Sequence, residues 1–502
     1  MGGDLSHSRS PHTREPVKHG CAPLPAACQA SEGKAPHITS NHHIKKLGKP
    51  AAIAREEQGM DRKFPINSPH EGELLAEEYE HEPVPASARR SVGSLTTVWL
   101  GFPMIITCAM TGSMLVASMG FTKAFWAIVT GNVLLFVLVS AIGAVGAQTG
   151  MNFALLASNV FGKRGYVAAS GLLSLLILGW FAVQVGFTGN ILHAAFGYNY
   201  FLISLVAGLL YLGITLVGIR GLHWIGVVSV PMFIILGTWV AFDAVSRSGV
   251  EAVWSYAGTE NGVPMAFGVA LTVVVGLFID GATVSPDFNR WAKNSLHSSI
   301  AAFVTFPIAH TYALLLGAVM TAALALPDAD PFALDNMFGY MLKYGAPWLL
   351  PVAVIFPFVS FGSVCSHNLY MSAVNWSRIV GVKMRTAAVM LAAFGIAIAA
   401  GNVWSYFVPW LNLLGILVPP VGAIFVVHFY TVSREPGPVG LWRPTAFAAW
   451  GIGSLTAYLI DYLAPQMSTS ISSFFAAAIA YWVISRLVLG VEMKEAGQSI
   501  AN

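Results

Sequence analysis

The sequence predicts an all-α membrane protein with twelve transmembrane helices. Of its 502 residues, 55% are hydrophobic and only 10% are charged, whereas a soluble domain has about 25% charged residues. Apolar runs of about 20 residues, long enough to cross the hydrocarbon core, recur from Leu95 to near the C-terminus. These runs exclude the several soluble domains that the length alone would suggest. The net charge of +3 is too small to indicate nucleic acid as a partner.

Residues 1–90 are polar and lack periodicity, so we expect a disordered cytoplasmic tail. No apolar segment follows the early charges, which argues against a signal peptide. Met60 opens a stretch that looks like a natural start, and we interpret residues 1–59 as an upstream extension or a dispensable tail. Detection of a native peptide from within them by mass spectrometry would contradict this. Cys21 and Cys28 lie near several His residues, but without regular ligand spacing we expect no metal site there.

After Arg90 the apolar runs are separated by polar loops. The twelve spans cover approximately residues 95–118, 124–147, 166–191, 200–219, 224–246, 266–286, 298–326, 348–373, 386–403, 407–430, 445–463 and 470–488. We expect residues 91–430 to form a ten-helix core and residues 431–490 to add two helices. Residues 491–502 are then a cytoplasmic C-terminal tail.

The loops between the spans differ in their basic residues, which indicates the orientation. One set of alternate loops contains Lys163, Arg164, Arg220, Arg290, Lys293, Arg378, Lys383, Arg385, Arg434 and Arg443. The other set contains Lys123, Arg247 and Lys343. Because basic residues favour the cytoplasmic side, the first set and both termini are predicted to be cytoplasmic. The acidic loop with Asp328, Asp330 and Asp335 then faces outward.

Two spans contain residues that interrupt a helix. Span 1 contains Gly101-Phe102-Pro103, and span 6 contains Gly276, then Asp280-Gly281 and Pro286. These are the first spans of two possible five-span halves, and transporters built from inverted repeats bind substrate and ion at such breaks. We therefore predict two broken helices, although Gly and Pro also occur in unbroken membrane helices.

Span 3 places Trp180 and Gln184 at positions i and i+4, on one face of a helix. A flat aromatic surface beside an amide that both donates and accepts hydrogen bonds suits a planar heterocycle. The alternative is that Trp180 packs against neighbours and Gln184 joins another helix, as single polar residues often do in membranes.

Span 8 carries a polar stripe. It consists of Ser360, Ser363, Val364, His367, Asn368 and Met371. Ser360 and Ser363 could offer oxygen atoms to a hard cation, or bond to the carbonyl four residues back. His367 could shuttle protons or be a hydrogen-bonded structural group. Asn368 could likewise have a functional or a structural role.

Asp280 is an acid at membrane depth, where a charge costs about 2.5–3.5 kcal/mol or more. It should therefore face a cavity, a partner or a ligand. Protonated, it could couple transport to a proton, and ionised, it could bind a cation or an N–H edge of a substrate. The structural alternative is that it caps the half-helix beyond the break.

From residue 83 to about residue 486 the chain resembles the nucleobase–cation symporter family. The ordered similarities are PVPASAR (Pro83 to Arg89), GN (Gly131-Asn132), GAQTG (Gly146 to Gly150), GWF (Gly179 to Phe181), DFNRW (Asp287 to Trp291) and PPVGA (Pro419 to Ala423). The resemblance implies a twelve-span symporter of the bacterial inner membrane with the leucine-transporter-type five-plus-five inverted repeat. Such a protein imports a nucleobase or related heterocycle by alternating access, with sodium or a proton as coupling ion and no other cofactor.

The resemblance also implies where the substrate and the ion bind. The base would lie between spans 1, 3, 6 and 8, stacked on Trp180 and in contact with Phe278. Gln184 matches a glutamine of hydantoin- and allantoin-type relatives. The remaining substrate-binding candidates are Asp280, Ser360 and Asn368. Sodium would bind at Gly101, Ile105, Ser360 and Ser363.

The sequence departs from the cytosine-carrying members of that family at polar positions. Ile177 stands where they have a glutamine, and Leu277 where they have a serine. In span 8, Ser360 replaces an asparagine and Val364 a hydroxyl residue. Because valine cannot ligate sodium, and because buried polar contacts discriminate strongly between substrates, we expect a base other than cytosine, with proton coupling through Asp280 as the alternative to sodium.

Other functional classes fit the sequence less well. No HExxH helix, GxSxG elbow or second acid paired with Asp280 supports an intramembrane enzyme. A passive channel has no need of two interrupted spans. Within DFNRW, Asp287 could pair with Arg290 or a neighbouring loop base as part of an inner gate, or be a solvated loop charge. The sequence leaves the oligomeric state open.

Overall fold

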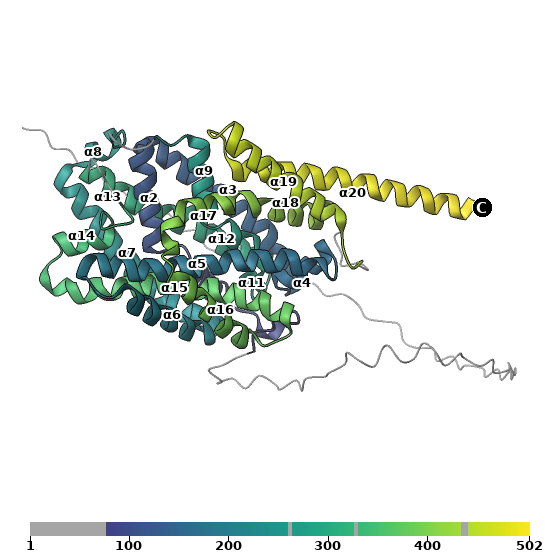
Figure 1. Cartoon of the computed structure of the whole chain (residues 1–502), viewed down its shortest axis with the longest axis horizontal. Coiled ribbons are helices and arrows are strands. Elements are labelled where there is room, and N and C mark those ends of the chain that lie inside the picture. Colours follow the sequence, from purple (N-terminus) through teal and green to yellow (C-terminus); the bar gives the residue numbers. More distant parts are fainter. Residues whose placement is uncertain (1–76, 260–263, 326–329, 433–439, 502) are drawn as a thin grey trace, which may run out of the picture. The chain divides into compact units, whose positions relative to one another are not determined.

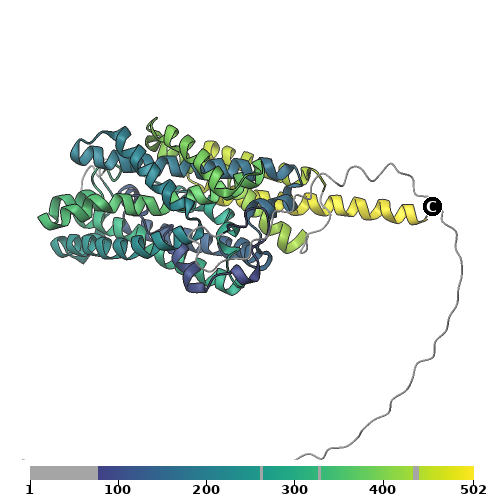
Figure 2. The same ribbon diagram turned by 90° about the horizontal axis from the view of Figure 1, so that it is seen from below.

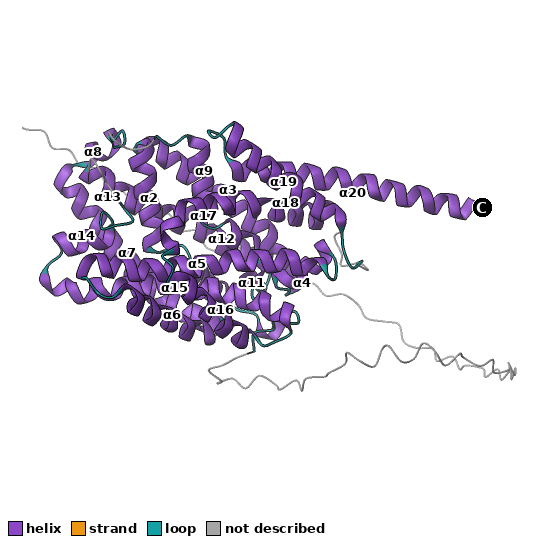
Figure 3. Cartoon of the chain, viewed as in Figure 1, coloured by secondary structure: helices purple, strands orange, loops and turns teal. Residues whose placement is uncertain are grey.

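The structure, a computed structural model, describes residues 77–259, 264–325, 330–432 and 440–501, with backbone only for residues 489–501. Within these ranges every regular element is a helix (Figure 3). The expectations for residues 1–59, Met60, Cys21 and Cys28 lie outside the described residues.

The helices follow the predicted spans in order along the chain (Figure 1). The first half contains α1 (Val92–Leu100), α2 (Ile106–Met119), α3 (Phe121–Thr149), α4 (Phe153–Phe161), α5 (Gly165–Phe196), α6 (Tyr200–Leu216), α7 (Ile219–Ser248) and α8 (Val250–Ser255). The second half contains α9 (Phe267–Gly276), α10 (Ile279–Thr283), α11 (Pro286–Asn289), α12 (Ser295–Phe303), α13 (Thr311–Leu324), α14 (Met337–Tyr344), α15 (Leu350–Val380), α16 (Met384–Ala399), α17 (Phe407–Leu417) and α18 (Pro419–Val427). Two further helices, α19 (Pro444–Leu463) and α20 (Thr469–Ala501), follow. The short 3₁₀-helical segments are η1 (Ala86–Ala88), η3 (Pro347–Leu349) and η4 (Val403–Tyr406), and the π-helical segments are η2 (Val304–His310) and η5 (His428–Val432).

Seven helical stretches of the described chain are long and apolar enough to cross a membrane, by length and composition. They correspond to predicted spans 2, 3, 5, 7, 8, 10 and 12. The apolar helices α2, α6, α9 and α16 are shorter, with 10–17 residues each. Two of these, α2 and α9, are short because spans 1 and 6 are broken.

Span 1 is broken, as its Gly and Pro predict. Helix α1 ends at Leu100, and α2 begins after Ile105, which has an extended backbone with φ −140° and ψ 157°. Pro103 lies between them, and because proline has no N–H it cannot continue the hydrogen-bond ladder of α1. The segment from Gly101 to Ile105 is therefore irregular and buried among the other spans.

Span 6 is also broken, and it forms three pieces. Helix α9 ends at Gly276, and Phe278, with φ −139° and ψ 11°, precedes α10. Pro286 begins α11, at a first-turn position where its missing N–H is harmless. The alternative that Asp280 caps the second half-helix is wrong, because Phe278 occupies the N-cap and Asp280 lies within the first turn of α10.

Two further spans deviate from regular helices at prolines. Span 7 contains a π-helical stretch, η2, around Pro307. Span 10, predicted as one helix over residues 407–430, is divided, because α18 begins at Pro419 directly after α17 ends. Pro419 and Pro420 cannot donate to the carbonyls of α17.

Helices α19 and α20 pack against each other, and α20 also packs against α18 (Figure 1). In the view turned by 90°, α20 again extends past its neighbours (Figure 2). The helix continues to Ala501 and therefore includes the backbone of the predicted C-terminal tail.

Residues 77–90 are ordered, so the predicted tail extends too far along the chain. The buried carboxylate of Glu78 accepts hydrogen bonds from the backbone N–H of Ile219 at 3.1 Å and from the hydroxyl of Tyr370 at 2.8 Å. The guanidinium of Arg290 donates to the backbone carbonyls of Glu78 and Tyr79 at 2.8 and 2.7 Å. These bonds join the segment to α7, α15 and the end of span 6.

Glu80 extends the same set of contacts. Its carboxylate accepts a hydrogen bond from the backbone N–H of Met384 at 2.9 Å, and its carbonyl accepts one from Asn152 at 2.8 Å. The segment thus also holds α16 and the start of α4. A polar composition predicted disorder, but here buried backbone and carboxylate groups find partners on several helices.

Helices α2 and α13 approach each other closely through two glycines (Figure 1). A Cβ atom at Gly112 would lie 1.8 Å from the carbonyl oxygen of Leu314, and one at Gly317 would lie 1.8 Å from that of Ala109. Backbones can approach this closely only where side chains are absent. We expect this contact to be essential for folding.

Gly112→Val and Gly317→Val should therefore each destabilise the protein by more than the roughly 1–3 kcal/mol typical of overpacking. The readout is monodispersity and melting temperature in detergent. Gly213→Val is the matched control, because no atom lies within 4 Å of its Cβ position and it should behave like the wild type. A monodisperse Gly112→Val protein with an unchanged melting temperature would contradict the close contact.

Attachment of residues 77–90 should depend on pH. Burial raises the pKa of Glu78 from 4.5 to about 7, and the Tyr370 hydroxyl and Arg290 oppose this. Because the pKa is higher in the attached state, protonation favours attachment, fully below about pH 4.5 and decreasingly as pH rises through about 7. Hydrogen exchange of residues 77–90, corrected for intrinsic rates, should therefore accelerate as pH rises from about 4.5 to about 7 and should level off above that.

Glu78→Gln should remove this additional acceleration, since a neutral amide does not titrate. Glu77→Gln is the matched control, because Glu77 is exposed and should leave the pH dependence unchanged. An identical pH profile for Glu78→Gln and the wild type would exclude Glu78 as the titrating group.

Candidate functional site

A small cavity lies where the two broken spans meet α5 and α15. Its volume is about 10 Å³, roughly the space of one water molecule. It is lined by Phe102, Ile105, Thr107, Cys108, Trp180, Gln184, Leu277, Phe278, Val364 and Asn368. The wall is mostly apolar, with a few amide and hydroxyl groups. Four of the predicted substrate-binding residues, Trp180, Gln184, Phe278 and Asn368, are therefore brought together.

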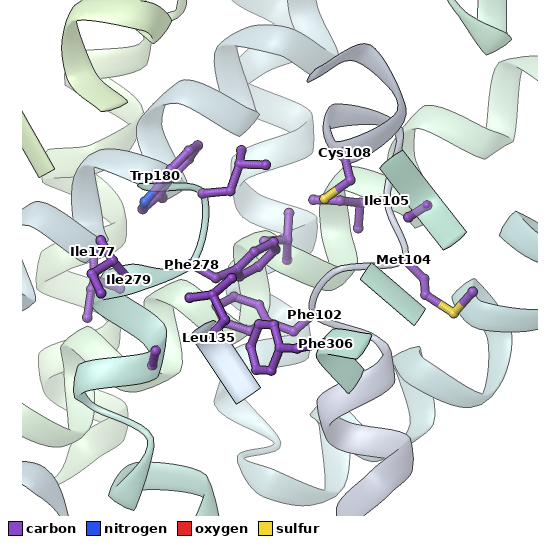
Figure 4. Close-up of a cluster of buried hydrophobic side chains, with 14 of the residues drawn as sticks. Phe102, Met104, Ile105, Cys108, Leu135, Ile177, Trp180, Phe278, Ile279 and Phe306 are labelled. Carbon is purple, nitrogen blue, oxygen red and sulfur yellow. The ribbon is translucent and has the colours of Figure 1, made fainter. Parts of the chain in front are cut away.

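Aromatic rings form one side of this cavity (Figure 4). Phe278 lies edge-on to Phe102, with ring centroids 4.9 Å apart and an interplanar angle of 74°. Trp180 is buried, and Figure 4 places it across from Phe102, with Phe278 between them. Because Phe102 belongs to the break of span 1 and Phe278 to that of span 6, the two breaks are in direct contact.

Phe278 is supported from behind by a residue pair that the sequence analysis missed. The ring of His310 lies 4.6 Å from that of Phe278, at 82°. Its Nδ1 hydrogen-bonds with the side-chain oxygen of Asn132 at 2.7 Å. Asn132 belongs to the GN motif, but nothing in the sequence relates it to His310, which lies 178 positions away.

Gln184 is held by a residue that the sequence analysis also missed. The hydroxyl of Thr107 donates a hydrogen bond to the side-chain carbonyl oxygen of Gln184 at 2.6 Å. Thr107 lies in the first turn of α2, directly after the break of span 1. The amide group of Gln184 is thereby tied to span 1, and its NH₂ group makes no hydrogen bond with the described residues.

Span 8 contributes Asn368 and Val364 to the wall. The side chain of Asn368 is buried and makes no hydrogen bond with the described part of the chain. Val364 and Leu277 present only hydrocarbon to the cavity. Ile177, one helical turn before Trp180, is buried but is not part of the wall.

Asp280 lies beside the cavity and does not line it. One carboxylate oxygen accepts a hydrogen bond from the backbone N–H of Gly281 at 2.7 Å. The other oxygen, Oδ2, is buried without a hydrogen-bond partner among the described residues, as is the indole nitrogen of Trp180. The indole N–H of Trp180 lies within electrostatic reach of the carboxyl group. Asp280 is thus next to the aromatic surface, with a free acceptor.

The predicted cation-binding residues also come together, but each of their polar groups already has a hydrogen-bond partner. The hydroxyl of Ser363 donates to the carbonyl oxygen of Gly101 at 2.6 Å. The hydroxyl of Ser360 accepts from the backbone N–H of Ile106 at 2.9 Å. The carbonyl of Ile105 accepts from the N–H of Cys108 within α2. Ser360 therefore supports the break of span 1 and is not part of the cavity wall.

His367 joins the same two spans. Its Nε2 lies 2.8 Å from the carbonyl oxygen of Val98 in α1, and its Nδ1 lies 2.6 Å from that of Ser363. A neutral imidazole donates one such bond and a protonated one donates both. The ring also stacks on Phe102 at 5.5 Å and 20°. His367 is therefore a bonded group that links α15 to α1.

Asp287 and Arg290 form no side-chain ion pair in the described part of the chain, although the Nε of Arg290 donates to the backbone carbonyl of Asp287 at 3.2 Å. The carboxylate of Asp287 accepts from the backbone N–H of Phe153 and from the amide of Asn375. Arg290 donates instead to the carbonyls of Glu78 and Tyr79. Neither residue is a solvated loop charge, because both are completely buried.

Comparison with known proteins agrees with this arrangement. Residues 83–438 match the family described as permeases for cytosine/purines, uracil, thiamine and allantoin. Cytosine permease of Escherichia coli (strain K12) is 31% identical over 360 residues, which cover 71% of this chain and 82% of that protein. Hydantoin permease of Microbacterium maritypicum is 21% identical over 419 residues, covering 76% and 83%.

Solved structures share the fold. A nucleobase-cation-symport-1 family transporter in a closed conformation with bromovinylhydantoin bound has a TM-score of 0.69 at 18% identity, covering 84% of this chain and 97% of that one. A Na⁺-coupled sialic acid symporter has a TM-score of 0.60 at 12% identity, covering 83% and 93%. The predicted all-α fold of the leucine-transporter type, with a five-plus-five inverted repeat and broken spans 1 and 6, is confirmed. Seven of the twelve predicted spans contain a helix that is long and apolar enough to cross a membrane.

The protein is accordingly a transporter and not an enzyme, as the sequence predicted. Both the sequence match, which covers most of the chain, and the shared fold support one assignment. The chain belongs to the family of permeases for cytosine/purines, uracil, thiamine and allantoin.

Proposed function

We propose that this protein is a cation symporter that imports a nucleobase or related planar heterocycle by alternating access. The observation that carries the proposal is the cavity in which Trp180 and Phe278 meet the amides of Gln184 and Asn368 at the two helix breaks. Flat aromatic surfaces bind planar rings, and amides bind their polar edges. The permeases named above lend the same substrate class to the proposal.

Entry of a substrate requires the surrounding helices to move. A volume of about 10 Å³ is far too small for a base. The irregular segments at Gly101–Ile105 and Leu277–Phe278 are the natural points of movement, because their backbone is not held by a continuous helical ladder. A cavity too small for the substrate is therefore consistent with one step of an alternating-access cycle.

The substrate we propose is a base other than cytosine. At the positions where cytosine-carrying members have polar groups, this chain has Leu277 and Val364 in the wall. A site loses discrimination for a polar edge when the matching group is absent. Asp280, with its free oxygen next to Trp180, is the acceptor that we assign to a ring N–H.

For the coupling ion we propose a proton carried by Asp280. Sodium at the predicted position would have to break the bond between Ser363 and the Gly101 carbonyl, and Val364 adds no oxygen ligand. Asp280 is the buried acid at the substrate site, and a proton on it would neutralise a charge that is costly in the membrane. We further propose the bacterial inner membrane, with both termini in the cytoplasm.

Uptake into proteoliposomes tests the function directly. Radiolabelled cytosine, adenine, hypoxanthine, uracil and allantoin would each be offered under an inward sodium gradient and, separately, under an inward proton gradient. Saturable uptake of at least one compound, accelerated by the proton gradient alone, supports the proposal. Sodium-driven cytosine uptake would replace it with an ordinary cytosine symporter, and linear, gradient-independent flux would identify a channel.

Trp180→Ala should weaken substrate binding strongly. Stacking of a base on an aromatic side chain contributes roughly 1–3 kcal/mol, which corresponds to a KM about 5- to 150-fold higher. Trp224→Ala is the matched control, since Trp224 lies on α7 with 65% of its surface exposed and should leave KM unchanged. Equal KM values for Trp180→Ala and the wild type would remove Trp180 from the site.

Asp280→Asn should abolish the response to a proton gradient. An amide keeps the shape and an acceptor oxygen but cannot exchange a proton. The measurement compares uptake with and without the gradient, beside exchange of labelled for unlabelled substrate at equal pH. Retention of full pH-driven uptake in Asp280→Asn would refute coupling through this residue.

A further inference from the structure

The hydrogen bond between Thr107 and Gln184 carries an inference beyond the binding site itself. Both residues line the cavity, and both are buried, with exposed fractions of 1%. The Thr107 hydroxyl has one hydrogen-bond partner among the described residues, the side-chain carbonyl oxygen of Gln184. The hydroxyl of Thr111, one helical turn later, donates to the backbone carbonyl of Thr107 and does not contact the Thr107 hydroxyl.

This pairing determines which half of the Gln184 amide faces the cavity. A hydroxyl carries a single hydrogen, and a buried hydroxyl without an acceptor is unfavourable. If the amide were turned over, its NH₂ group would donate to Thr107, and the hydroxyl hydrogen would have no partner. The orientation in which Thr107 donates to the carbonyl oxygen is therefore favoured, and it leaves the two N–H groups of Gln184 to the cavity.

The orientation of the Asn368 amide, unlike that of Gln184, is not fixed by a neighbouring side chain of the described residues. Its amide is buried at the same cavity and has no hydrogen-bond partner among the described residues. It can turn either its carbonyl or its NH₂ group toward a ligand, since both orientations leave its other partners unchanged. Asn368 can therefore adapt to the substrate, whereas Gln184 cannot.

We propose that Thr107 is a positioning residue that makes Gln184 a fixed hydrogen-bond donor, and that the protein therefore selects heterocycles with a carbonyl oxygen over analogues with an amino group at the same position. This inference rests on the proposed function and specifies its substrate class. A keto oxygen accepts from the Gln184 N–H groups, whereas an exocyclic amino group would bring donor against donor. Hypoxanthine and adenine are the probes, because they carry a carbonyl and an amino group at the same ring position, with the adjacent ring nitrogen changing from an N–H donor to an acceptor.

The position of Thr107 adds a second consequence. Thr107 lies on α2, in the first turn after the break of span 1, and Gln184 lies on α5. If α2 moves away from α5 during transport, the Gln184 amide loses its fixed orientation. Selection for the keto oxygen therefore operates in the arrangement in which Thr107 and Gln184 are hydrogen-bonded.

The test measures KM and kcat for hypoxanthine and adenine in the wild type, Thr107→Val and Thr107→Ser, with direct binding of both labelled bases to the purified proteins. The wild type should favour hypoxanthine. Thr107→Val keeps the shape but lacks the hydroxyl. The KM for adenine divided by the KM for hypoxanthine should therefore fall by about tenfold or more. Thr107→Ser should restore the ratio, and kcat should change little, because the effect is on recognition.

Thr111→Val is the matched control, since its hydroxyl only bonds back within α2 and it is absent from the cavity wall. It should retain the ratio of the wild type. Equal changes of both KM values in Thr107→Val, or an unchanged ratio, would overturn the positioning role while leaving the transporter intact. A wild type that prefers adenine would also overturn it. A wild type that neither binds nor transports any base would refute the proposed function, and this inference with it.

Discussion

The constraint on which this structure depends is the satisfaction of backbone polar groups that the two helix breaks release. In the membrane interior no water is available, and each unsatisfied N–H or C=O group costs several kcal/mol. Helix α15 supplies the partners for span 1: Ser363 donates to the Gly101 carbonyl, and Ser360 accepts from the Ile106 N–H. The broken span and the serines of span 8 are therefore one structural unit, and neither is stable in this form without the other.

This constraint also explains the composition of the cavity. The serines that look like cation ligands in the sequence have their hydroxyl groups turned to the backbone of span 1, which leaves the wall to aromatic and aliphatic side chains. The few amides that remain act in a medium of low polarity, where each hydrogen bond and each unpaired group has a large effect on binding. The orientation of one amide, that of Gln184, then decides which edge of a ring is accepted.

The sequence predicted those features that depend on neighbouring residues. Gly101 and Pro103 mark the first break because of their own backbone chemistry, and Trp180 and Gln184 share a face because of helical spacing. The partners of these residues could not be predicted. Thr107 and Gln184 are 77 positions apart, and Ile106 and Ser360 are 254 apart. One sequence gives no information on such pairs, because they depend on how the spans pack together.

Residues 77–90 are predicted to be disordered for the same reason, because their partners lie far away in the sequence. Their polar composition indicates a chain that cannot form a core of its own, which is correct for the segment alone. It is ordered because buried groups elsewhere need it: the guanidinium of Arg290 lies in the interior, and the carbonyls of Glu78 and Tyr79 are among its acceptors. A buried cation without acceptors is strongly unfavourable.

The same bonds bear on the proposed alternating-access cycle, because they join residues 77–90 to several different spans. Arg290 follows α11 of the broken span 6, Tyr370 belongs to α15, and Met384 begins α16. Through Glu78 and Glu80, residues 77–90 hydrogen-bond to all three. A movement that opens this end of the bundle must break these bonds or carry the segment with one of the helices. The arrangement of these helices in the structure therefore depends on residues 77–90, whose composition alone predicts a disordered tail.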